Sequence, residues 1–308
     1  MVVDLEYDFN AAVASMDIFS QQDFDSLKQW IQKLDRSKYV PKDLTDKQLL
    51  LFYNACYGDL ERTKVCIEKY YQLRKNAPEM FDNRILSSEE VQPSVEALEF
   101  AFLPEKSCQG YDLIYHRLHN TEPSKYHLEP GCKILFMTVD ACLSKRGPQP
   151  GHIFLFDMQG VKLGHLTRVS LSFQKDRQRS LRKFFQYVQE AMPVRMREIH
   201  VFNSEPIVDK LLMLIRPFMD KKFFDMIKFH HKNEDLEKFY ETVVPRAALP
   251  PDHGGTLPDT QTLHKKCMQT LKALEPYFRS EEEQRINALP DKKRDKAMEK
   301  AFKNLEID

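Results

Sequence analysis

The sequence lacks the features of a membrane-spanning or exported protein. Its 308 residues contain no apolar run of about 18 residues, the length that a transmembrane helix needs. The first residues, Met-Val-Val-Asp-Leu-Glu, are acidic, whereas a secretory signal begins with basic residues followed by an apolar stretch. We therefore expect a cytoplasmic protein.

Excess charge and patterned cysteines are absent as well. Lysine and arginine total 46, and aspartate and glutamate also total 46, which argues against a globally basic nucleic-acid-binding protein. The six cysteines are irregularly spaced and form no CxxC motif. Cys132 and Cys142 would lie about 15 Å apart on one helix, too far for a disulfide. We expect reduced thiols and no nucleic-acid partner.

Motifs that carry catalysis or hold a metal are missing too. The patterns GxSxG, GxGxxG and HExxH do not occur, and neither does GxxxxGK followed by Ser or Thr. His116 and His119 flank the end of a predicted strand. His230 and His231 are adjacent, so on a strand they point to opposite faces and make a poor metal site. We expect no enzyme, no catalytic residue, no cofactor and no metal.

What the sequence does contain is a βαβ pattern rich in aromatic residues, with 21 Phe and 12 Tyr. Apolar runs at 152–156 and 199–203 have the length of strands, and a basic amphipathic stretch reaching Met192 lies between them. A mostly apolar helix follows, from Pro206 to Ile215. This order predicts a parallel βαβ unit, whose strands are covered on both faces.

The remaining segments predict an α/β protein with a helical N-terminus. Amphipathic patterns at 20–34, after the capping box of Thr45 and Gln48, and from Asp59 to Pro78 predict three helices. Strands are expected at 111–118 and 226–230, with a helix at 128–144. We therefore expect a helical bundle over 1–80, a linker over 81–110, a mostly parallel α/β domain over 111–258 and a helical tail over 259–308. The charged part of the tail beyond Arg279 is expected to pack loosely, with a thin apolar stripe at Met298, Phe302 and Leu305.

An ordered series of short motifs resembles one family. The series runs Phe-Asp-Met-Gln-Gly-Val-Lys-Leu-Gly-His at 156–165, Pro-Val-Arg-Met-Arg-Glu-Ile-His at 193–200, Asn-Ser-Glu-Pro at 203–206 and Leu-Pro-Pro-Asp-His-Gly-Gly-Thr at 249–256. In this order the motifs resemble the CRAL-TRIO lipid-binding domain. The likeness is greatest to insect members related to the α-tocopherol transfer protein and the cellular retinaldehyde-binding protein. It implies non-enzymatic binding and membrane transfer of one small hydrophobic molecule, tocopherol-, retinoid- or carotenoid-like, or a phospholipid.

The resemblance also implies an apolar pocket closed by a helical lid at 205–222. From pattern alone the same residues would form an ordinary closed core. Thr138 corresponds to a polar pocket position and would orient a ligand hydroxyl directly or through water. The expected ligand-binding residues are Ile134, Thr138, Phe154, Phe156, Phe184, Tyr187, Val188, Met192, Val201, Ile207, Leu211, Leu214 and Ile215. Val208 and Leu212 are expected on the adjacent stripe of the lid, free to meet a bilayer.

A basic set beside the lid is the last candidate site. The resemblance implies that Arg195, Arg197 and Lys222, with neighbouring Lys221, bind an anionic membrane surface transiently. Basic family positions correspond here to Met226 and to Asn54 or Cys56, so part of a phosphoinositide site is missing. The alternatives are a solvated surface and an adaptor that binds a phosphoinositide or a protein partner. A basic insertion at 172–179 has no assigned role, and we expect a monomer.

Overall fold

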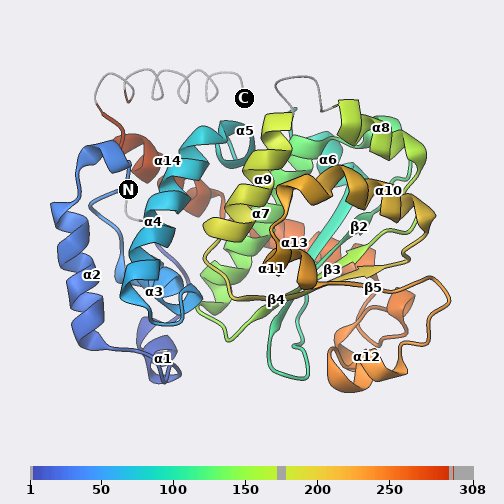
Figure 1. Ribbon diagram of the computed structural model, residues 1–308, viewed down its shortest axis with the longest axis horizontal. Helices are drawn as coiled ribbons and strands as arrows, with labels where there is room; N and C mark the ends of the chain where they lie inside the picture. The colour runs from blue at the N-terminus through green and yellow to red at the C-terminus, as the bar shows by residue number, and fades with distance from the viewer. Residues whose placement is uncertain (1–2, 172–177, 291–293, 295–308) are drawn as a thin grey trace.

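The computed structural model describes residues 3–171, 178–290 and 294, with a helical N-terminal part beside an α/β part (Figure 1). The N-terminal helices that start before residue 77 begin at side-chain caps, for example Thr45, which forms a complete capping box with Gln48. The three predicted helices are confirmed, and short helices flank them. The bounds are α1 Phe9–Ala14, α2 Gln21–Lys33, η1 Arg36–Lys38, α3 Asp46–Ala55, α4 Leu60–Asn76 and α5 Pro78–Phe81.

The sheet of the α/β part has five strands in the order β1-β2-β3-β4-β5. β1 pairs antiparallel with β2, and the other pairs are parallel, so the predicted mostly parallel α/β fold is confirmed. β1 is a correction, because it lies in the segment 81–110 that was expected to be a linker. The bounds are β1 Leu98–Phe102, β2 Asp112–Leu118, β3 His152–Asp157, β4 Met196–Phe202 and β5 Ile227–Phe229.

Helices surround this sheet and connect its strands. In Figure 1, α9, α10 and α11 lie in front of the sheet, and α13 lies behind it. α7 and α13 both pack on the edge strand β1. The bounds are α6 Gln92–Ala97, α7 Leu128–Arg146, α8 Leu163–Leu171, α9 Gln178–Glu190, α10 Pro206–Ile215, α11 Lys221–Asp225, α12 Glu237–Thr242, α13 Thr260–Ala273 and α14 Glu275–Asn287, with 3-10 turns η2 Pro123–Lys125, η3 Arg216–Phe218, η4 Arg246–Ala248 and η5 Pro251–His253.

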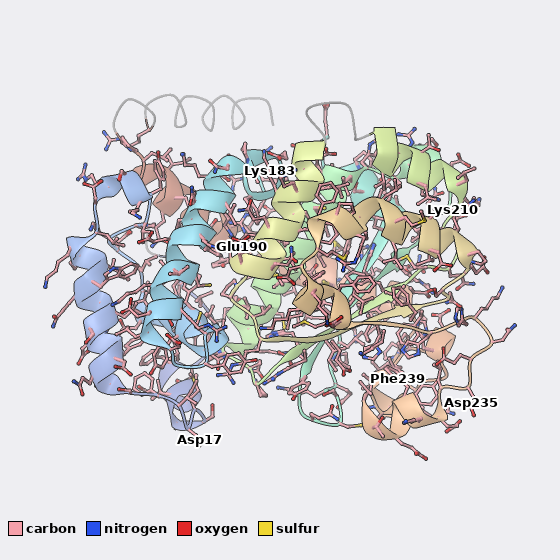
Figure 2. All side chains as sticks on the ribbon, viewed as in Figure 1. Asp17, Lys183, Glu190, Lys210, Asp235 and Phe239 are labelled. Carbon is pink, nitrogen blue, oxygen red and sulfur yellow. The ribbon has the colours of Figure 1, made fainter. Side chains whose placement is uncertain are left out.

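Strand register decides which side chains share a face of the sheet. Phe156 of β3 lies opposite His116 of β2 and Val201 of β4, and Val201 lies opposite Phe229 of β5. Because successive side chains alternate, these residues face the same side. The opposite face carries His200 and Phe202, whose rings pack against Phe239 of α12, labelled in Figure 2.

A buried ion-pair network joins the three parts of the chain. Arg74 of α4 lies 2.9 Å from Asp140 of α7 and 3.2 Å from Glu281 of α14. Arg84 pairs with the same two carboxylates, and Arg285 lies 3.0 Å from Glu281. The side chains of Arg74 and Arg84 are fully buried.

This network corrects the expectation of a loosely packed tail. Up to Asn287 the tail forms α13 and α14, whose charged residues Glu281 and Arg285 are buried. Charges are expected inside only when they are paired in this way. The expected stripe at Met298, Phe302 and Leu305 lies outside the described residues, as does 172–177 of the basic insertion.

Replacing Glu281 with Gln tests the network. The change leaves buried arginines with one carboxylate fewer, so we expect a loss of about 3–5 kcal/mol in the free energy of unfolding at pH 7. Urea denaturation measures this loss. The exposed Glu241→Gln is the control and should change stability by less than about 0.5 kcal/mol.

The same glutamate predicts how stability depends on pH. Burial alone would raise the pKa of Glu281, but Arg285, Arg84 and Arg74 lower it to about 2. Because the pKa is lower in the folded state than in the unfolded state, its contribution is present above pH 4.5 and is lost as the pH falls toward 2. The Glu281→Gln variant should lack this component. Equal acid profiles for the wild type and the variant would contradict the assignment.

Candidate functional site

An apolar cavity of about 250 Å³ lies between the sheet and the helices α7, α9 and α10. Its floor comes from the face of the sheet that carries Phe156 and Val201. An engineered apolar cavity of roughly 150 Å³ binds benzene, so the space has the size of a small ring or part of a longer chain. Of the residues expected to bind ligand, those that line the cavity are Phe154, Phe156, Phe184, Val188, Met192, Val201, Leu211 and Ile215.

Ile134 and Thr138 lie on another face of α7, away from the cavity. The Thr138 hydroxyl donates to the Ile134 carbonyl at 2.9 Å and lies 3.9 Å from Cys267 of α13. The cavity instead meets Cys132, Leu135 and Val139 of the same helix, together with Gly131 and Phe136. The expectation that Thr138 orients a ligand is therefore wrong, because α13 covers the face of α7 that carries it.

Tyr187 is also turned away from the cavity, because α9 has two buried faces. Phe184 and Val188 face the cavity. Tyr187 faces α4, where its hydroxyl accepts hydrogen bonds from Arg74 at 2.7 and 3.1 Å. A stripe at positions 184, 187 and 188 looks uniform in the sequence, yet only part of it reaches the ligand space.

The helix over the cavity, α10, is rotated relative to the expectation. Its cavity face consists of Val208, Leu211, Leu212 and Ile215, a spacing that forms one stripe of a helix. Ile207 and Leu214 lie outside this wall. Because apolar residues occur nearly all around α10, the sequence pattern did not set its rotation.

His116 is a polar residue that lines the cavity. The sequence analysis did not predict it as a ligand contact. Its Nδ1 lies 3.1 Å from the Glu99 carbonyl oxygen, and its ring stacks on Phe100 at 4.3 Å. Burial lowers the pKa of His116 to about 4, so the ring is neutral near pH 7. Since a carbonyl only accepts, Nδ1 carries the proton and Nε2 is left as an acceptor. The pairing of His116 with Phe156 in neighbouring strands is the signal that could have located it.

A second pocket, of about 550 Å³, adjoins the first and is lined by apolar residues and by charges of both signs, the acidic ones being Glu61, Glu190 and Asp220. Val188, Met192, Met196 and Phe223 line both pockets. Arg195 and Lys222 of the expected basic set lie in its wall. Two cations that were not predicted, Arg62 and Lys69 of α4, lie there as well. Lys69 is paired with Glu190, labelled in Figure 2, at 2.6 Å.

Arg195 is held in place at this pocket. Its Nε donates to the Asn54 carbonyl at 2.7 Å, and its guanidinium lies 4.3 Å from the centre of the Tyr57 ring. Within the described residues, its buried Nη2 has no hydrogen-bond partner. A buried guanidinium nitrogen without an acceptor favours an anionic ligand.

The other two members of the basic set lie outside the pocket. Arg197 donates to the Pro150 carbonyl at 2.7 and 3.1 Å, and its ring neighbours are Tyr57 and Tyr111. Lys221 is exposed and pairs with Asp225 at 2.6 Å. Sequence spacing could not separate Lys221 from Lys222, because neighbouring residues on a helix point in different directions.

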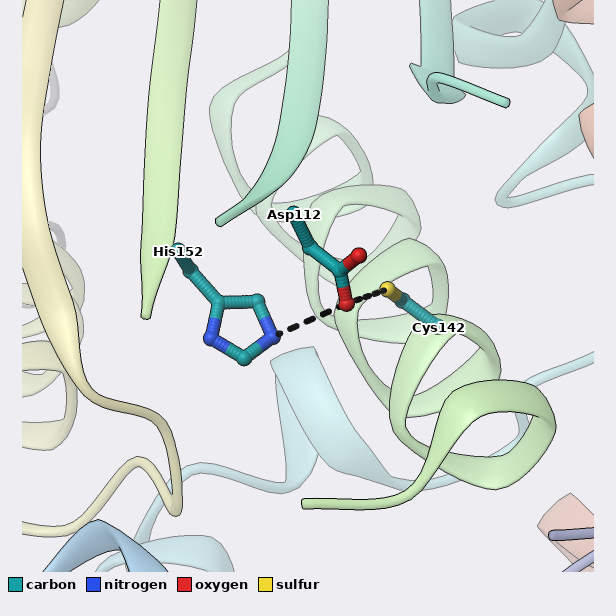
Figure 3. A group of neighbouring side chains, drawn as sticks. All are labelled: Asp112, Cys142 and His152. Atoms are coloured by element: carbon teal, nitrogen blue, oxygen red, sulfur yellow. Dashed lines mark hydrogen bonds and ion pairs between the residues drawn. The ribbon is translucent and has the colours of Figure 1, made fainter. Parts of the chain in front are cut away.

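Asp112, Cys142 and His152 form a buried group that resembles a metal-ligand set (Figure 3). Asp112 Oδ2 lies 3.5 Å from Cys142 Sγ and 3.8 Å from His152 Nε2. The other oxygen of Asp112 already accepts from Arg146 at 2.7 Å and lies 3.5 Å from Lys106. Burial raises the pKa of Cys142, so the thiol keeps its proton. Two neighbouring cations and a protonated thiol disfavour the binding of a divalent metal ion here. We therefore assign a structural role to this group.

Comparisons with known proteins agree with this architecture. The family described as CRAL/TRIO domain matches residues 98–255, and the family described as Pinta-like, UBA domain matches residues 19–91. The proteins called "Alpha-tocopherol transfer protein-like" of Homo sapiens and Pongo abelii are each 24% identical over 237 residues. That alignment covers 76% of this chain and 66% of the relative, so the chain spans just under two thirds of their length.

The mouse protein of the same name is 24% identical over 242 residues, which cover 78% of this chain and 66% of that protein. A crystal structure of Sfh5 aligns with a TM-score of 0.47 and 13% identity, covering 84% of this chain and 93% of that one. Within the part of the chain that the structure describes, no helix is long and apolar enough to cross a membrane.

Proposed function

This chain belongs to the CRAL/TRIO domain family, and we propose that it binds one small hydrophobic molecule and transfers it between membranes without changing it chemically. The apolar cavity under α10 is the observation that carries the proposal. Burying roughly 500 Å² of ligand surface would gain about 12 kcal/mol. Association and ordering cost several kcal/mol, so an affinity between nanomolar and micromolar remains.

The segment from Glu205 to Lys222 acts as the lid. It contains α10, which begins at Pro206 without a side-chain cap, and ends in the turn around Pro217. The cavity is smaller than the roughly 300–1,000 Å³ that drug-sized ligands occupy. A larger ligand therefore requires outward movement of the lid.

His116 favours a ligand that carries a hydroxyl group. His116 lines an otherwise apolar wall, and its Nε2 accepts a hydrogen bond but does not donate one. A hydroxyl satisfies this acceptor, whereas an ether or an aldehyde does not. Among the tocopherol-like, retinoid-like, carotenoid-like and phospholipid candidates, the His116 acceptor therefore favours molecules that carry a free hydroxyl next to their apolar part.

Release takes place at a membrane surface that the lid touches. Met213 of α10 and Leu163 of α8 are 77% and 62% exposed, and α8 and α10 pack on each other. Lys210, labelled in Figure 2, is exposed on the same helix as Met213. Exposed apolar residues beside a cation suit an anionic bilayer. The second pocket, with Arg195 and Lys222, binds an anionic headgroup there.

An adaptor that holds a phosphoinositide or a protein partner is the alternative function. Arg195 Nη2, which has no hydrogen-bond partner among the described residues, favours it, because it marks an anion site that does not depend on the apolar cavity. Native mass spectrometry of the purified protein separates the two. One lipid per chain supports carriage, and a protein that never takes up an apolar molecule supports the adaptor.

Phe156→Asp tests the cavity floor. A carboxylate in this apolar space costs several kcal/mol or must be protonated, so we expect at least a tenfold loss of affinity for a fluorescent apolar ligand. Fluorescence titration should show about one site per wild-type chain. Phe156→Leu is the matched control and should bind within a few-fold of the wild type. Normal binding by a folded Phe156→Asp protein would place the ligand elsewhere.

His116→Phe tests the choice of a hydroxyl. The variant loses one hydrogen bond of about 1 kcal/mol, so we expect about a fivefold weaker affinity for an apolar alcohol. The methyl ether of the same alcohol should bind the wild type and the variant equally. Competition against the fluorescent ligand measures both. An equal loss for alcohol and ether would show that the change only disturbs packing.

Lys222→Glu and Lys221→Glu test the second pocket as a matched pair. Each substitution changes the net charge equally, but only Lys222 lines the pocket. We expect Lys222→Glu to slow transfer to anionic vesicles several-fold more than Lys221→Glu does, with ligand affinity unchanged in both. Added salt should slow the wild type. Equal effects of the two substitutions would indicate only a general attraction to charge.

A further inference from the structure

One side chain, Gln189 of α9, holds the C-terminal end of the lid. Its Nε2 donates to the Phe218 carbonyl at 3.0 Å, and its Oε1 accepts from the Asp220 amide at 2.8 Å. Nε2 also donates to the Phe185 carbonyl of its own helix at 2.8 Å. Phe218 ends η3, and Asp220 is the N-cap of α11. A single amide group therefore connects the lid to α9 through two hydrogen bonds.

α9 gives this amide group a fixed base. Next to Gln189 in the chain, Glu190 pairs with Lys69 of α4 at 2.6 Å. Two residues before Gln189, Tyr187 accepts hydrogen bonds from the buried Arg74 of the same helix. Because both contacts lead to α4, the position of Gln189 does not depend on the lid.

The N-terminal end of the lid is attached to the sheet instead. The Ser204 N–H donates to the His230 carbonyl at 3.0 Å, and the Ser204 carbonyl accepts from Nδ1 of His231 at 3.0 Å. Beside it, the Asn203 side chain donates to the buried Asp157 carboxylate at 2.6 Å. Asn203 has a φ of 53°, a left-handed conformation that asparagine tolerates and that turns the chain out of the strand. This end is therefore held by several groups.

Between its two ends, the lid is held by apolar contacts. Within the described residues, no hydrogen bond or ion pair joins residues 205–217 to a residue outside the lid. The inner face meets the cavity through apolar side chains such as Val208 and Leu211. The hydrophobic effect that holds such contacts is non-directional, so it does not fix one end more firmly than the other. The attachments at the two ends therefore decide how the lid moves.

We propose that Gln189 is the latch of the lid, and that Asn203 and Ser204 form its pivot. When the Gln189 amide releases Phe218 and Asp220, η3 moves away from α9 and takes α10, which packs on it, along. Asp220 is exposed and Phe218 is half-buried, so water replaces the lost hydrogen bonds and the release costs little. The opening starts at the C-terminal end of the lid rather than at the start of α10.

The latch lies where the apolar cavity adjoins the second pocket. Gln189 and Asp220 line the second pocket, and Val188 and Phe223 line both spaces. Release of the latch therefore opens the cavity toward the charged pocket, and a ligand with a polar end leaves on that side. This exit route rests on the proposed function, whereas opening of the lid is measured without a ligand.

A cysteine reporter in the cavity wall tests the latch in protein without added ligand. Val208 is 2% exposed and lines the cavity, so the thiol introduced by Val208→Cys reacts with a maleimide only while the lid is open. We expect Gln189→Met in this background to raise the labelling rate about tenfold, which corresponds to about 1.4 kcal/mol. Peptide mass spectrometry measures the rate at each cysteine.

Two controls separate the latch from general loosening of the fold. Gln186→Met makes the same change at an exposed position of α9 and should label as the parent protein does. The native Cys142 and Cys267, which are buried away from the cavity, report unfolding and should keep their rates in every variant. An unchanged rate at the introduced thiol in the Gln189→Met protein would overturn the proposal. So would a rise that Cys142 and Cys267 share.

Ligand loss tests the exit route. Retinol, a fluorescent apolar alcohol, is bound to each protein, and its transfer to neutral phosphatidylcholine vesicles is followed. We expect about tenfold faster loss from Gln189→Met than from the wild type, with Gln186→Met unchanged. Equal loss from all three proteins would show that the ligand leaves by another route and would overturn this step. If the wild type takes up no retinol, the proposed function fails for this class of ligand, and cysteine labelling still decides the latch.

Discussion

The buried ion pairs of Arg74, Arg84 and Arg285 with Asp140 and Glu281 set the arrangement on which the rest of the molecule depends. They join α4, α7 and α14, which lie far apart in the sequence. Taking such charges out of water is costly, and removing one partner leaves another buried without its counter-charge. The N-terminal part, through Arg74 and Arg84, therefore pairs both with Asp140 of the sheet domain and with Glu281 of the C-terminal helix. Their separation would expose or unpair these groups.

This network also makes the two sides of the cavity unequal. Asp140 belongs to α7 and Tyr187 to α9, so these two cavity-lining helices are both held by hydrogen bonds from Arg74. α10, on the other side, is apolar and more exposed and has no side-chain cap at its start. Among these elements, α10 is therefore the one that can move without breaking buried charge pairs. This difference supports the proposed role of α10 as a lid opposite a fixed wall.

The polar groups around the cavity fall into two separate sets. His116 is neutral, and its Nδ1 is hydrogen-bonded to the Glu99 carbonyl, so the residue contributes one hydrogen-bond acceptor to an otherwise apolar wall. Arg195 and Lys222 line the second pocket, which is separated from the apolar cavity by a wall that includes Met192 and Phe223. The apolar cavity and the charged pocket are thus neighbouring but separate spaces.

The sequence alone determined the parts that depend on local pattern and on family motifs. These include the N-terminal helices, the parallel strands from β2 to β5, and the floor at Phe154, Phe156 and Val201. Other features required the tertiary structure. The rotation of α10 was ambiguous because nearly every face of that helix is apolar, and Thr138 was hidden because α13 packs on its side of α7. The pairing of Arg74 with Glu281 leaves no periodic signal in the chain. Hydrophobic periodicity tells which residues are buried, but contacts between distant segments decide what each buried residue touches.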